Sequence, residues 1–384
     1  MTDPDGFTGE GRIGAFTNFT AYAEQEQVSF FFGHDWTITE QLSLNWGVRH
    51  ETIDIEGYNQ FATQVSDKEG GADDDPNTLY DNQIQTLGAP QRYDVSLDYT
   101  SFSGALSYEW NDAQSTYIRF SEGDKAPALS TFMGTGGIED YQLTPQTITQ
   151  LELGHRIYGD NYSITLTPFY SELTNIGGFG SASQGKNVDG TTYTRASLLS
   201  AQETIGLEIE SEYDLSDSLS LNWNATVQSS ESTDNSYWDY GTANNAATGF
   251  DDDKVVSLPD GAAPNTPNFT SALTGNYTLD DWKLFATWRY MGERPISTQD
   301  QLQFEAFHTI DVGVNWTPNE NWSVNLNVNN LLNEHGVMSW QGIGDFGALS
   351  RATDPKAGPT GDLRWSVVQQ QPRLVFLTAK YKFN

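Results

Sequence analysis

The stretch that decides the fold is 322–330, which reads Trp-Ser-Val-Asn-Leu-Asn-Val-Asn-Asn. Side chains alternate between the two faces of a strand, so Trp322, Val324, Leu326 and Val328 share one face and Ser323 shares the other with asparagines. A strand with one apolar and one wet face fits the wall of a membrane barrel, which has lipid outside and a polar interior. A half-buried strand of a soluble sandwich alternates in the same way, so the fold class depends on whether the rest of the chain repeats the pattern.

The composition is that of an aromatic, weakly charged and acidic chain. It has 384 residues and no Cys, with 19 basic and 52 acidic residues and a formal net charge of -33. Charged residues make up 18% of the chain and aromatic residues 13%. Few charges and many aromatics suit a wall with interfacial girdles and a lipid-facing band. A secreted all-β domain rich in Tyr and Trp is the alternative that composition leaves open.

The same numbers exclude several classes of protein. The acidic balance argues against nucleic acid as a partner and against an enzyme of phosphate chemistry. The lack of Cys removes disulfides and thiolate zinc sites. An apolar run of about eighteen residues, which a helical membrane span needs, is missing. The start, 1–6, has neither the basic residues nor the apolar core of a signal peptide, so we expect a cytoplasmic protein, a mature chain or a fragment that begins inside a longer protein.

The alternation recurs in paired strands. Strand-like segments lie at 27–36 and 42–50, and predicted hairpins join 93–110 to 115–120, 147–158 to 162–173, 204–213 to 219–228, 269–277 to 282–290, and 308–316 to 322–330. Every second connection is a tight turn, and the others are loops of about fifteen residues or more, a length that is uncommon in soluble domains. An outer-membrane barrel has this asymmetry, with tight periplasmic turns at one rim and long extracellular loops at the other.

We therefore predict an all-β fold, an antiparallel transmembrane β-barrel, with the soluble sandwich as the alternative. The chain supplies about thirteen strands, or fourteen if 16–22 also pairs. Residues 1–25 are expected to be a loop or partial strand leading in, and residues 26–384 the barrel portion.

Three segments resemble motifs of the TonB-dependent outer-membrane receptors. Ser121-Glu-Gly-Asp-Lys-Ala-Pro-Ala-Leu129 resembles the family's Ser/Ala-Glu-Gly-Phe-Arg-Ala-Pro-x-Leu, with Asp124 where an aromatic is usual. Val328-Asn-Asn-Leu-Leu-Asn333 resembles Val-x-Asn-Leu-Phe-Asn/Asp, with Leu332 in place of Phe. Pro372-Arg373 followed by Ala379-Lys-Tyr-Lys-Phe383 resembles the closing strand, although Asn384 follows where the family ends on the aromatic. The motifs occur in the family's order over about 27–384.

The resemblance implies a barrel of about 22 strands with an N-terminal plug inside it. Counted back from its end, this chain would supply strands from about the tenth onward, without the signal sequence, the TonB-contacting box, the plug or the early strands. Taken alone, such a portion is expected to form an open, curled sheet or a smaller closed barrel.

No catalytic, metal or cofactor site is predicted, so we expect a protein that is not an enzyme. The five histidines are scattered and form no His-Glu-x-x-His pattern. Glu208 and Glu210 share a strand face, as glycosidase acids do, but are interpreted as wet lumen carboxylates. The triplets 73–75 and 251–253 are runs of Asp without the spacing of a calcium loop, and we expect them to be solvated loop charge.

Aromatic residues supply the other candidate sites. Candidates for stacking on a ligand ring from extracellular loops are Tyr237, Trp238, Tyr240, Phe250, Trp340 and Phe346. Five tryptophans beside tight turns are expected to form a periplasmic aromatic girdle: Trp36, Trp110, Trp282, Trp316 and Trp322. Tyr381 and Phe383 fall where the resemblance places a C-terminal signal for barrel assembly.

The function that the resemblance implies is active import across the outer membrane of a Gram-negative bacterium. The expected cargo is a scarce, bulky solute, a ferric siderophore first and a carbohydrate second. The expected partners are the TonB energy-transducing complex, acting through a plug outside this chain, the outer-membrane lipid and lipopolysaccharide, and the small-molecule ligand; nucleic acid is not expected. A passive porin-like channel and a soluble extracellular β-sandwich binding protein are the alternatives.

Overall fold

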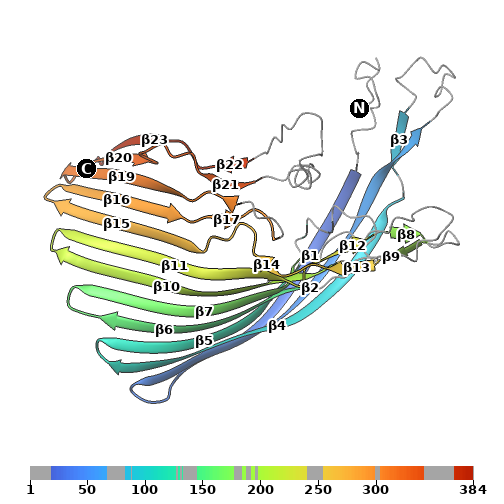
Figure 1. Cartoon of the computed structure of the whole chain (residues 1–384), viewed down its shortest axis with the longest axis horizontal. Helices are drawn as coiled ribbons and strands as arrows, with labels where there is room; N and C mark the ends of the chain where they lie inside the picture. Colours follow the sequence, from blue (N-terminus) through green and yellow to red (C-terminus); the bar gives the residue numbers. More distant parts are fainter. Residues whose placement is uncertain are drawn as a thin grey trace.

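The structure is a computed structural model that describes residues 19–66, 83–87, 89–126, 129, 132, 145–176, 184–186, 192–194, 198–239, 254–298, 303–340 and 367–383. These residues form strands almost throughout and belong to one large sheet with short hairpins at one of its ends (Figure 1). Within the described residues, no helix combines the length and the apolar character needed to cross a membrane.

Thirteen long strands follow one another across the sheet in chain order. They are β1 (Phe19–Thr37), β2 (Leu42–Ser66), β4 (Gln91–Asn111), β5 (Gln114–Lys125), β6 (Gln146–Tyr158), β7 (Tyr162–Ile176), β10 (Ser200–Ser216), β11 (Leu219–Thr233), β15 (Phe269–Leu279), β16 (Trp282–Met291), β19 (Phe307–Asn319), β20 (Trp322–Asn329) and β23 (Leu374–Tyr381). All neighbours in this order are antiparallel. The predicted all-β antiparallel sheet is confirmed, and residues 19–22 begin β1 instead of forming a further strand.

Shorter strands extend the sheet or stand beside it. β3 (Gln83–Leu87) pairs with β2, and β14 (Gly261–Ala262) pairs with β11. Four pairs form separate hairpins: β8 (Gln184–Lys186) with β9 (Thr192–Thr194), β12 (Ser236–Asp239) with β13 (Lys254–Ser257), β17 (Arg294–Pro295) with β18 (Gln303–Phe304), and β21 (Val337–Trp340) with β22 (Val367–Gln369).

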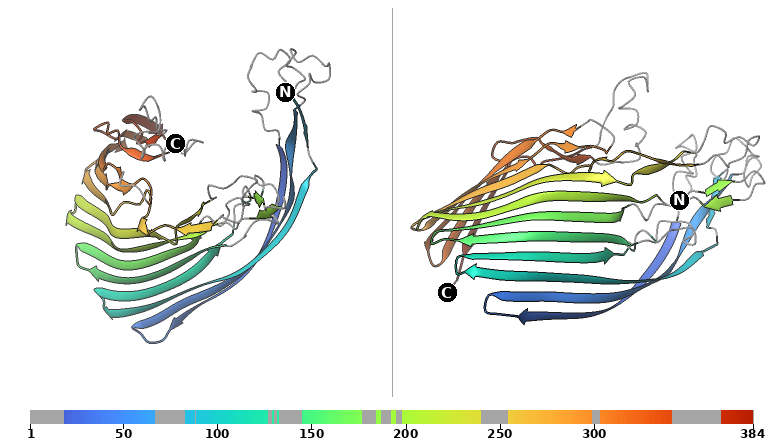
Figure 2. Two further views of the ribbon diagram at one scale, coloured as in Figure 1. Left: turned by 45° about the vertical axis from the view of Figure 1, so that its right-hand side comes forward. Right: turned by 60° about the horizontal axis from the view of Figure 1, so that its bottom comes forward.

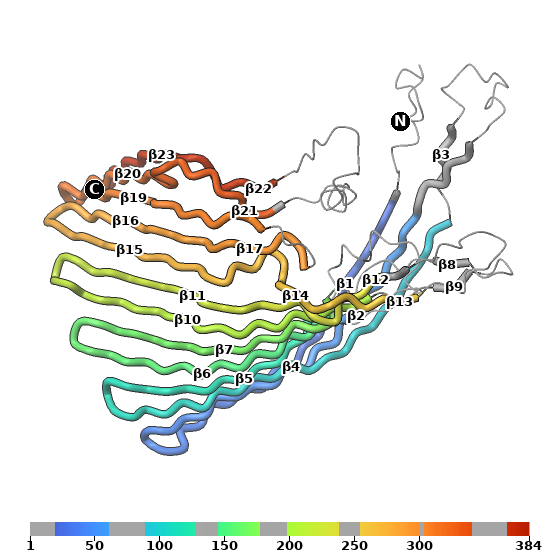
Figure 3. The backbone as a smooth tube through the Cα atoms, in the orientation of Figure 1, coloured from blue at the N-terminus to red at the C-terminus, as the bar shows by residue number. Residues whose placement is uncertain are grey.

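The two kinds of connection lie at opposite rims of the sheet. The short turns at 38–41, 112–113, 159–161, 217–218, 280–281 and 320–321 all fall at the left of Figure 1, and the tube in Figure 3 shows them in one row. The longer connections, with the small hairpins, leave from the other rim. The predicted separation of tight turns from long loops is therefore confirmed.

The sheet curls into an open trough. β1 and β23 are its two edges, and they lie apart in the left-hand view of Figure 2. The described residues thus form the open, curled sheet that was expected for a barrel portion. The wall is one layer thick, so its apolar faces are not packed against each other as they are in a sandwich.

The two faces of the wall differ in polarity across many strands. Leu106, Ile118 and Leu153 lie directly opposite one another on β4, β5 and β6, and they are 39–49% exposed on the outer face. Three positions along each strand, on the inner face, Ser103, Ser121 and Gln150 form the corresponding row. Apolar side chains exposed on the convex side and polar ones on the concave side are the arrangement of a wall with lipid outside and water inside.

This polarity inverts on β1, β2 and β4 beyond the level of Val28. Below it the outer face carries Phe30 and Phe32, whereas above it Glu24, Glu56 and Asp94 lie opposite one another on that face. The inner face changes in the opposite sense, from small and polar residues to buried apolar ones. The strands therefore leave the apolar surroundings at this level and continue as a wing whose outer side is acidic (Figure 1, upper right).

A small hydrophobic core lies on the inner side of this wing. Its buried residues are Ile53, Ile55, Tyr93 and Phe132, and Ala126 and Leu129 pack against them. The side-chain amide of Asn59 donates a 2.6 Å hydrogen bond to the carbonyl of Phe132, and the Tyr93 hydroxyl donates one of 3.2 Å to the carbonyl of Tyr22. The Ala-Pro-x-Leu motif that follows β5 thus has a structural role, because its Ala and Leu help to close this core.

Glycines on the inner face accommodate aromatic rings from the neighbouring strand. Four glycines each lie directly opposite an aromatic residue whose ring occupies the place of a Cβ: Gly57 opposite Tyr93, Gly154 opposite Tyr117, Gly206 opposite Phe169, and Gly313 opposite Phe285. A concave face brings side chains together, and a ring laid over glycine relieves that crowding while covering exposed backbone.

The Val-x-Asn-Leu motif forms the turn that receives the last strand. Asn330 is 2% exposed and has a positive φ of 50°, and its amide donates hydrogen bonds to the carbonyls of Glu334 (2.9 Å) and Gln371 (2.8 Å). Asn333 accepts a 2.9 Å hydrogen bond from the backbone N–H of Arg373. Two motifs that are distant in sequence therefore join here, because the first holds the segment that leads into β23.

Replacing Gly154 by Ala should destabilise the sheet. The new methyl group would overlap the Tyr117 ring, which is confined by the Arg156 guanidinium 5.1 Å from its centre. We expect a loss of about 1–3 kcal/mol in the free energy of unfolding of the full-length protein in detergent. Gly123→Ala is the control, since its Cβ would approach only the Ser101 side chain, at 3.6 Å or more, on the same face. Equal losses in the two variants would contradict the ring-over-glycine role.

Asn330 should tolerate Gly better than Ala. Both variants lose the amide hydrogen bonds. In the left-handed backbone conformation of this residue, Ala adds strain of about 1–2 kcal/mol, whereas Gly adopts that conformation without strain. Thermal unfolding of the full-length protein should rank the native residue above Asn330→Gly and this variant above Asn330→Ala. If Asn330→Ala is as stable as Asn330→Gly, the left-handed turn is not what constrains this position.

Candidate ligand cavity on the inner face

Three ion pairs lie on the inner face. Among the described residues the ion pairs are Arg49–Glu51 (2.9 Å), Arg119–Glu152 (4.0 Å) and Arg289–Asp311, and all six side chains alternate onto the inner face. The neighbouring inner positions on β11, β15, β19 and β20 are mainly Asn and Thr. The inner wall between β11 and β20 is therefore mainly a surface of amides and hydroxyls, whereas Glu208 and Glu210 on β10 add carboxylates outside these three pairs.

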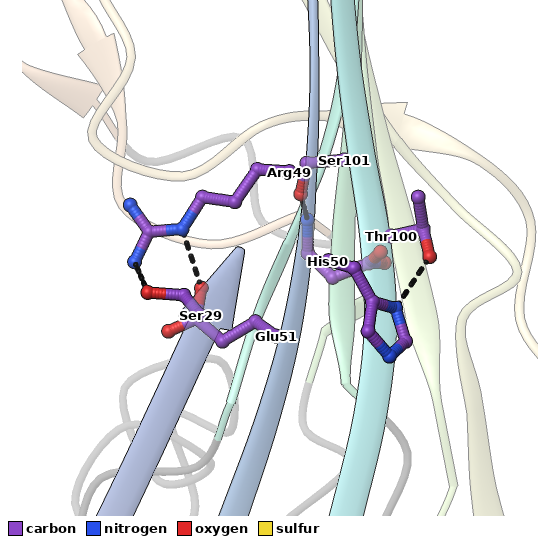
Figure 4. A network of polar contacts seen from close by, with 7 residues as sticks. Ser29, Arg49, His50, Glu51, Thr100 and Ser101 are labelled. Carbon is purple, nitrogen blue, oxygen red and sulfur yellow. Dashed lines mark hydrogen bonds and ion pairs between the residues drawn. The ribbon is translucent and has the colours of Figure 1, made fainter. Parts of the chain in front are cut away.

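Figure 4 shows polar groups on both faces near the level where the polarity inverts. Arg49 on the inner face forms an ion pair with Glu51 and donates a 3.2 Å hydrogen bond to Ser29 Oγ. On the outer face, His50 Nδ1 lies 2.9 Å from Thr100 Oγ1. Polar residues on both faces mark this height as the boundary of the apolar outer surface, since Phe30 of that surface lies directly opposite His50.

A cavity of about 500 Å³ lies on the inner face near the rim of the long connections. Its floor is formed by β11, β15, β16, β19 and β20, and its cover by Met338 of β21 and by residues 370–372. A volume of this size is within the range of small-molecule sites. Neutral polar groups surround it: Asn224, Thr226, Thr270, Thr309, Asn329, Gln370 and Gln371.

Arg294 fixes the cover of this cavity. The residue is 2% exposed, and its guanidinium donates hydrogen bonds to the carbonyls of Val337 and Met338, the latter at 2.7 Å. The guanidinium also lies 5.3 Å from the ring centre of Phe304 and 5.6 Å from that of Phe307. Burial lowers the pKa of Arg294, but an arginine remains protonated at any physiological pH. A buried cation held by carbonyls and rings ties the β17–β18 hairpin to β21.

Arg289 is the cation of the cavity wall. Its side chain is 53% exposed, and it pairs with Asp311, whose side chain is 19% exposed. Asp311 also accepts a 2.8 Å hydrogen bond from the backbone N–H of Asn330, so both of its oxygens are engaged. Sequence reasoning did not find this pair; the signal was an Arg and an Asp at inner positions of adjacent strands.

The aromatic candidates for ligand binding are not assembled into one site. Tyr237 is 47% exposed on β12. Trp238 lies on the same strand and Trp340 on β21, and only their backbones are described. Tyr240, Phe250 and Phe346 lie outside the described residues. The predicted ligand role of these six residues is therefore still a prediction.

The predicted girdle residues lie at the tight-turn rim and are 37–56% exposed: Trp36, Trp110, Trp282, Trp316 and Trp322. Trp282 and Trp316 face each other across β16 and β19 with ring centres 5.3 Å apart. Tyr381 packs against Trp322 at 4.9 Å and against Phe383 at 4.8 Å. Large exposed aromatics along one rim are typical of a membrane interface.

The carboxylates singled out in the sequence lie partly inside and partly outside the described residues. Glu208 and Glu210 are exposed on the inner face of β10. Within the described part of the chain, no group of three or more His, Asp and Glu side chains is placed to hold a metal ion. The Asp runs 73–75 and 251–253 lie outside the described residues.

Comparison with known structures supports the same architecture. The chain resembles the ferric yersiniabactin uptake receptor FyuA from Yersinia pestis (TM-score 0.65, 15% identity, 96% of this chain and 47% of that one). It also resembles the siderophore receptor PiuA from Acinetobacter baumannii (0.64, 14%, 94% and 44%) and the ferric-catecholate import receptor Fiu from E. coli in its closed form (0.60, 18%, 94% and 45%). At these identities the likeness shows the fold, and the chain spans less than half the length of each of the three.

The sequence itself matches a family profile described as TonB dependent receptor-like, beta-barrel, over residues 2–331. The match covers most of the chain, and it includes the inner-face ion pairs and the Val-x-Asn-Leu turn. The chain belongs to the β-barrel family of the TonB-dependent receptors, which are proteins of the Gram-negative outer membrane.

Proposed function

We propose that this chain is the C-terminal barrel portion of a TonB-dependent importer that takes up a scarce, bulky solute. The observation that carries the proposal is the mainly polar inner wall below the wing, with a covered cavity near the rim of the long connections. In the proposed cycle the solute binds at this rim, a plug supplied by another part of the protein blocks the lumen, and energy delivered through TonB displaces the plug. The protein is a transporter in this proposal, and no step of it is catalytic.

The outer face of the wall determines how the protein lies in the membrane. The apolar band contacts lipid and lipopolysaccharide, the five tryptophans lie at the periplasmic interface, and the acidic wing extends into the extracellular space. Within hydrocarbon the free backbone groups of β1 and β23 need hydrogen-bonding partners, so these edges are where the rest of a closed barrel joins. Tyr381 and Phe383, exposed at the end of β23, are proposed as the barrel-assembly signal.

A ferric siderophore is the first candidate cargo, and carbohydrate is the second. Two of the similar structures are named for ferric yersiniabactin and ferric catecholate, and the pyoverdine receptor of Pseudomonas aeruginosa, bound to ferripyoverdine, is also similar (TM-score 0.55, 13% identity). These names support the first candidate without fixing it. The amide- and hydroxyl-rich lining of the cavity is the feature that favours a carbohydrate.

Deletion of the gene in the source bacterium should slow growth under iron restriction when a ferric siderophore is the only iron source. Uptake of the iron-55 complex should fall about tenfold or more, because diffusion of a bulky complex through general pores is slow. Complementation with the intact gene should restore uptake, and complementation in a strain that lacks TonB should not.

Three results separate the alternatives. Uptake that persists without TonB would indicate a passive channel. Loss of growth on an oligosaccharide, with iron uptake intact, would assign the cargo to carbohydrate. No change in either kind of uptake would contradict the import proposal.

A further inference from the structure

The cavity combines one oriented cation with an apolar surface. The Arg289 guanidinium has five N–H donors, and the only acceptor it contacts in the described part of the chain is Asp311. The Arg289 side chain is half-exposed, whereas the Asp311 carboxylate is mostly covered. One oxygen of Asp311 contacts Arg289, and the other accepts a hydrogen bond from the backbone N–H of Asn330. The carboxylate thus holds the cation in place, and the remaining donors of the cation are available to a ligand.

The rest of the lining defines what such a ligand must look like. Met291, Phe307 and Met338 give the cavity an apolar surface, while the surrounding amides and hydroxyls supply neutral hydrogen bonds. A ligand that fits has an apolar part, such as an aromatic ring, and at least one negatively charged oxygen. A neutral sugar would leave the free guanidinium donors without a charged partner, and such charge-assisted bonds are the strong ones.

The cavity is also preformed. Arg294 anchors β21 through two carbonyls, and Asn330 anchors the segment before β23 through the carbonyl of Gln371. Both anchoring side chains are 2% exposed, so the cover is attached by groups that are costly to separate. A ligand therefore meets Arg289 in a fixed geometry, which favours discrimination between charged and neutral groups.

We propose that this cavity is a subsite for a carboxylate or phenolate oxygen on an aromatic unit of the imported solute, with Arg289 as its anchor. The inference rests on the proposed import function and refines it by selecting an anionic ligand over a neutral one. It assigns the selection to one residue of the wall, outside the aromatic loops that the sequence suggested.

The test uses the full-length receptor in detergent and the iron(III) complex of 2,3-dihydroxybenzoate, an anionic aromatic probe. Arg289→Gln should weaken binding about tenfold to a hundredfold, the range of a charge-assisted hydrogen-bonded contact. Arg289→Lys should recover part of the affinity because it keeps the charge. The affinity of the native receptor should fall with added salt, and Arg289→Gln should flatten that dependence.

Arg119→Gln is the matched control. Arg119 also lies on the inner face, is 52% exposed and faces a carboxylate, Glu152, but it is not part of the cavity. This variant should bind the probe as the native receptor does. Each variant is first shown to be folded by the heat-dependent shift of its band in gel electrophoresis.

Three outcomes would overturn the proposal: absence of binding to the native receptor at millimolar probe, unchanged binding in Arg289→Gln, or an equal loss in Arg119→Gln. None of them alters the growth and uptake measurements on the deletion strain. Failure of the subsite is therefore distinguishable from failure of the import function, which would show as unchanged uptake.

Discussion

The constraint on which this structure depends is that backbone polar groups in hydrocarbon must be hydrogen-bonded within the protein. A strand meets this requirement only through its neighbours, and the thirteen long strands follow one another without a crossover, each antiparallel to the next. Because every strand pairs in the same way, only the side chains can differ between the two faces of the sheet. One face can then be apolar for lipid and the other polar for water, and short turns at one rim keep adjacent strands in register.

The wing formed by β1, β2 and β4 shows that the solvent determines which face is apolar. Along β2 the inner residues change from Arg49 and Glu51 to Ile53 and Ile55 without a break in pairing. Below this level hydrocarbon lies outside and the polar side chains face inward. Above it water lies outside, so the wing needs its own core, and the segment after β5 provides it through Leu129 and Phe132. The apolar side chains of β2 thus lie on the outer face in its lower part and on the inner face in its upper part, and the change marks where the apolar surroundings end.

The sequence predicted the features that follow from period-two alternation and turn chemistry. These include the antiparallel sheet, the segregation of turns from loops and the hairpin positions, because each depends on residues that are close in the chain. The strand that begins at Leu42 was predicted to end at residue 50, but β2 runs to Ser66. The outer residues of this upper part of β2 are polar, which by itself suggests a loop. The strand is nevertheless stable there because a hydrophobic core covers its inner side. That core depends on Phe132, 73 residues from Asn59, and such a contact leaves no local signal.

The cavity, too, depends on contacts between residues that are distant in the chain and that the sequence does not reveal. Its anchoring groups, Arg294 and Asn330, find their partners about forty residues further along the chain, at Met338 and Gln371. Each partner is a backbone carbonyl, and carbonyls are identical at every position, so no residue type could reveal the pairing. A buried guanidinium without a carboxylate is stable only if several such acceptors and rings surround it together. The cover therefore forms as a unit, and the wall beneath it, held by its ladder of hydrogen bonds, offers a ligand one fixed arrangement of groups.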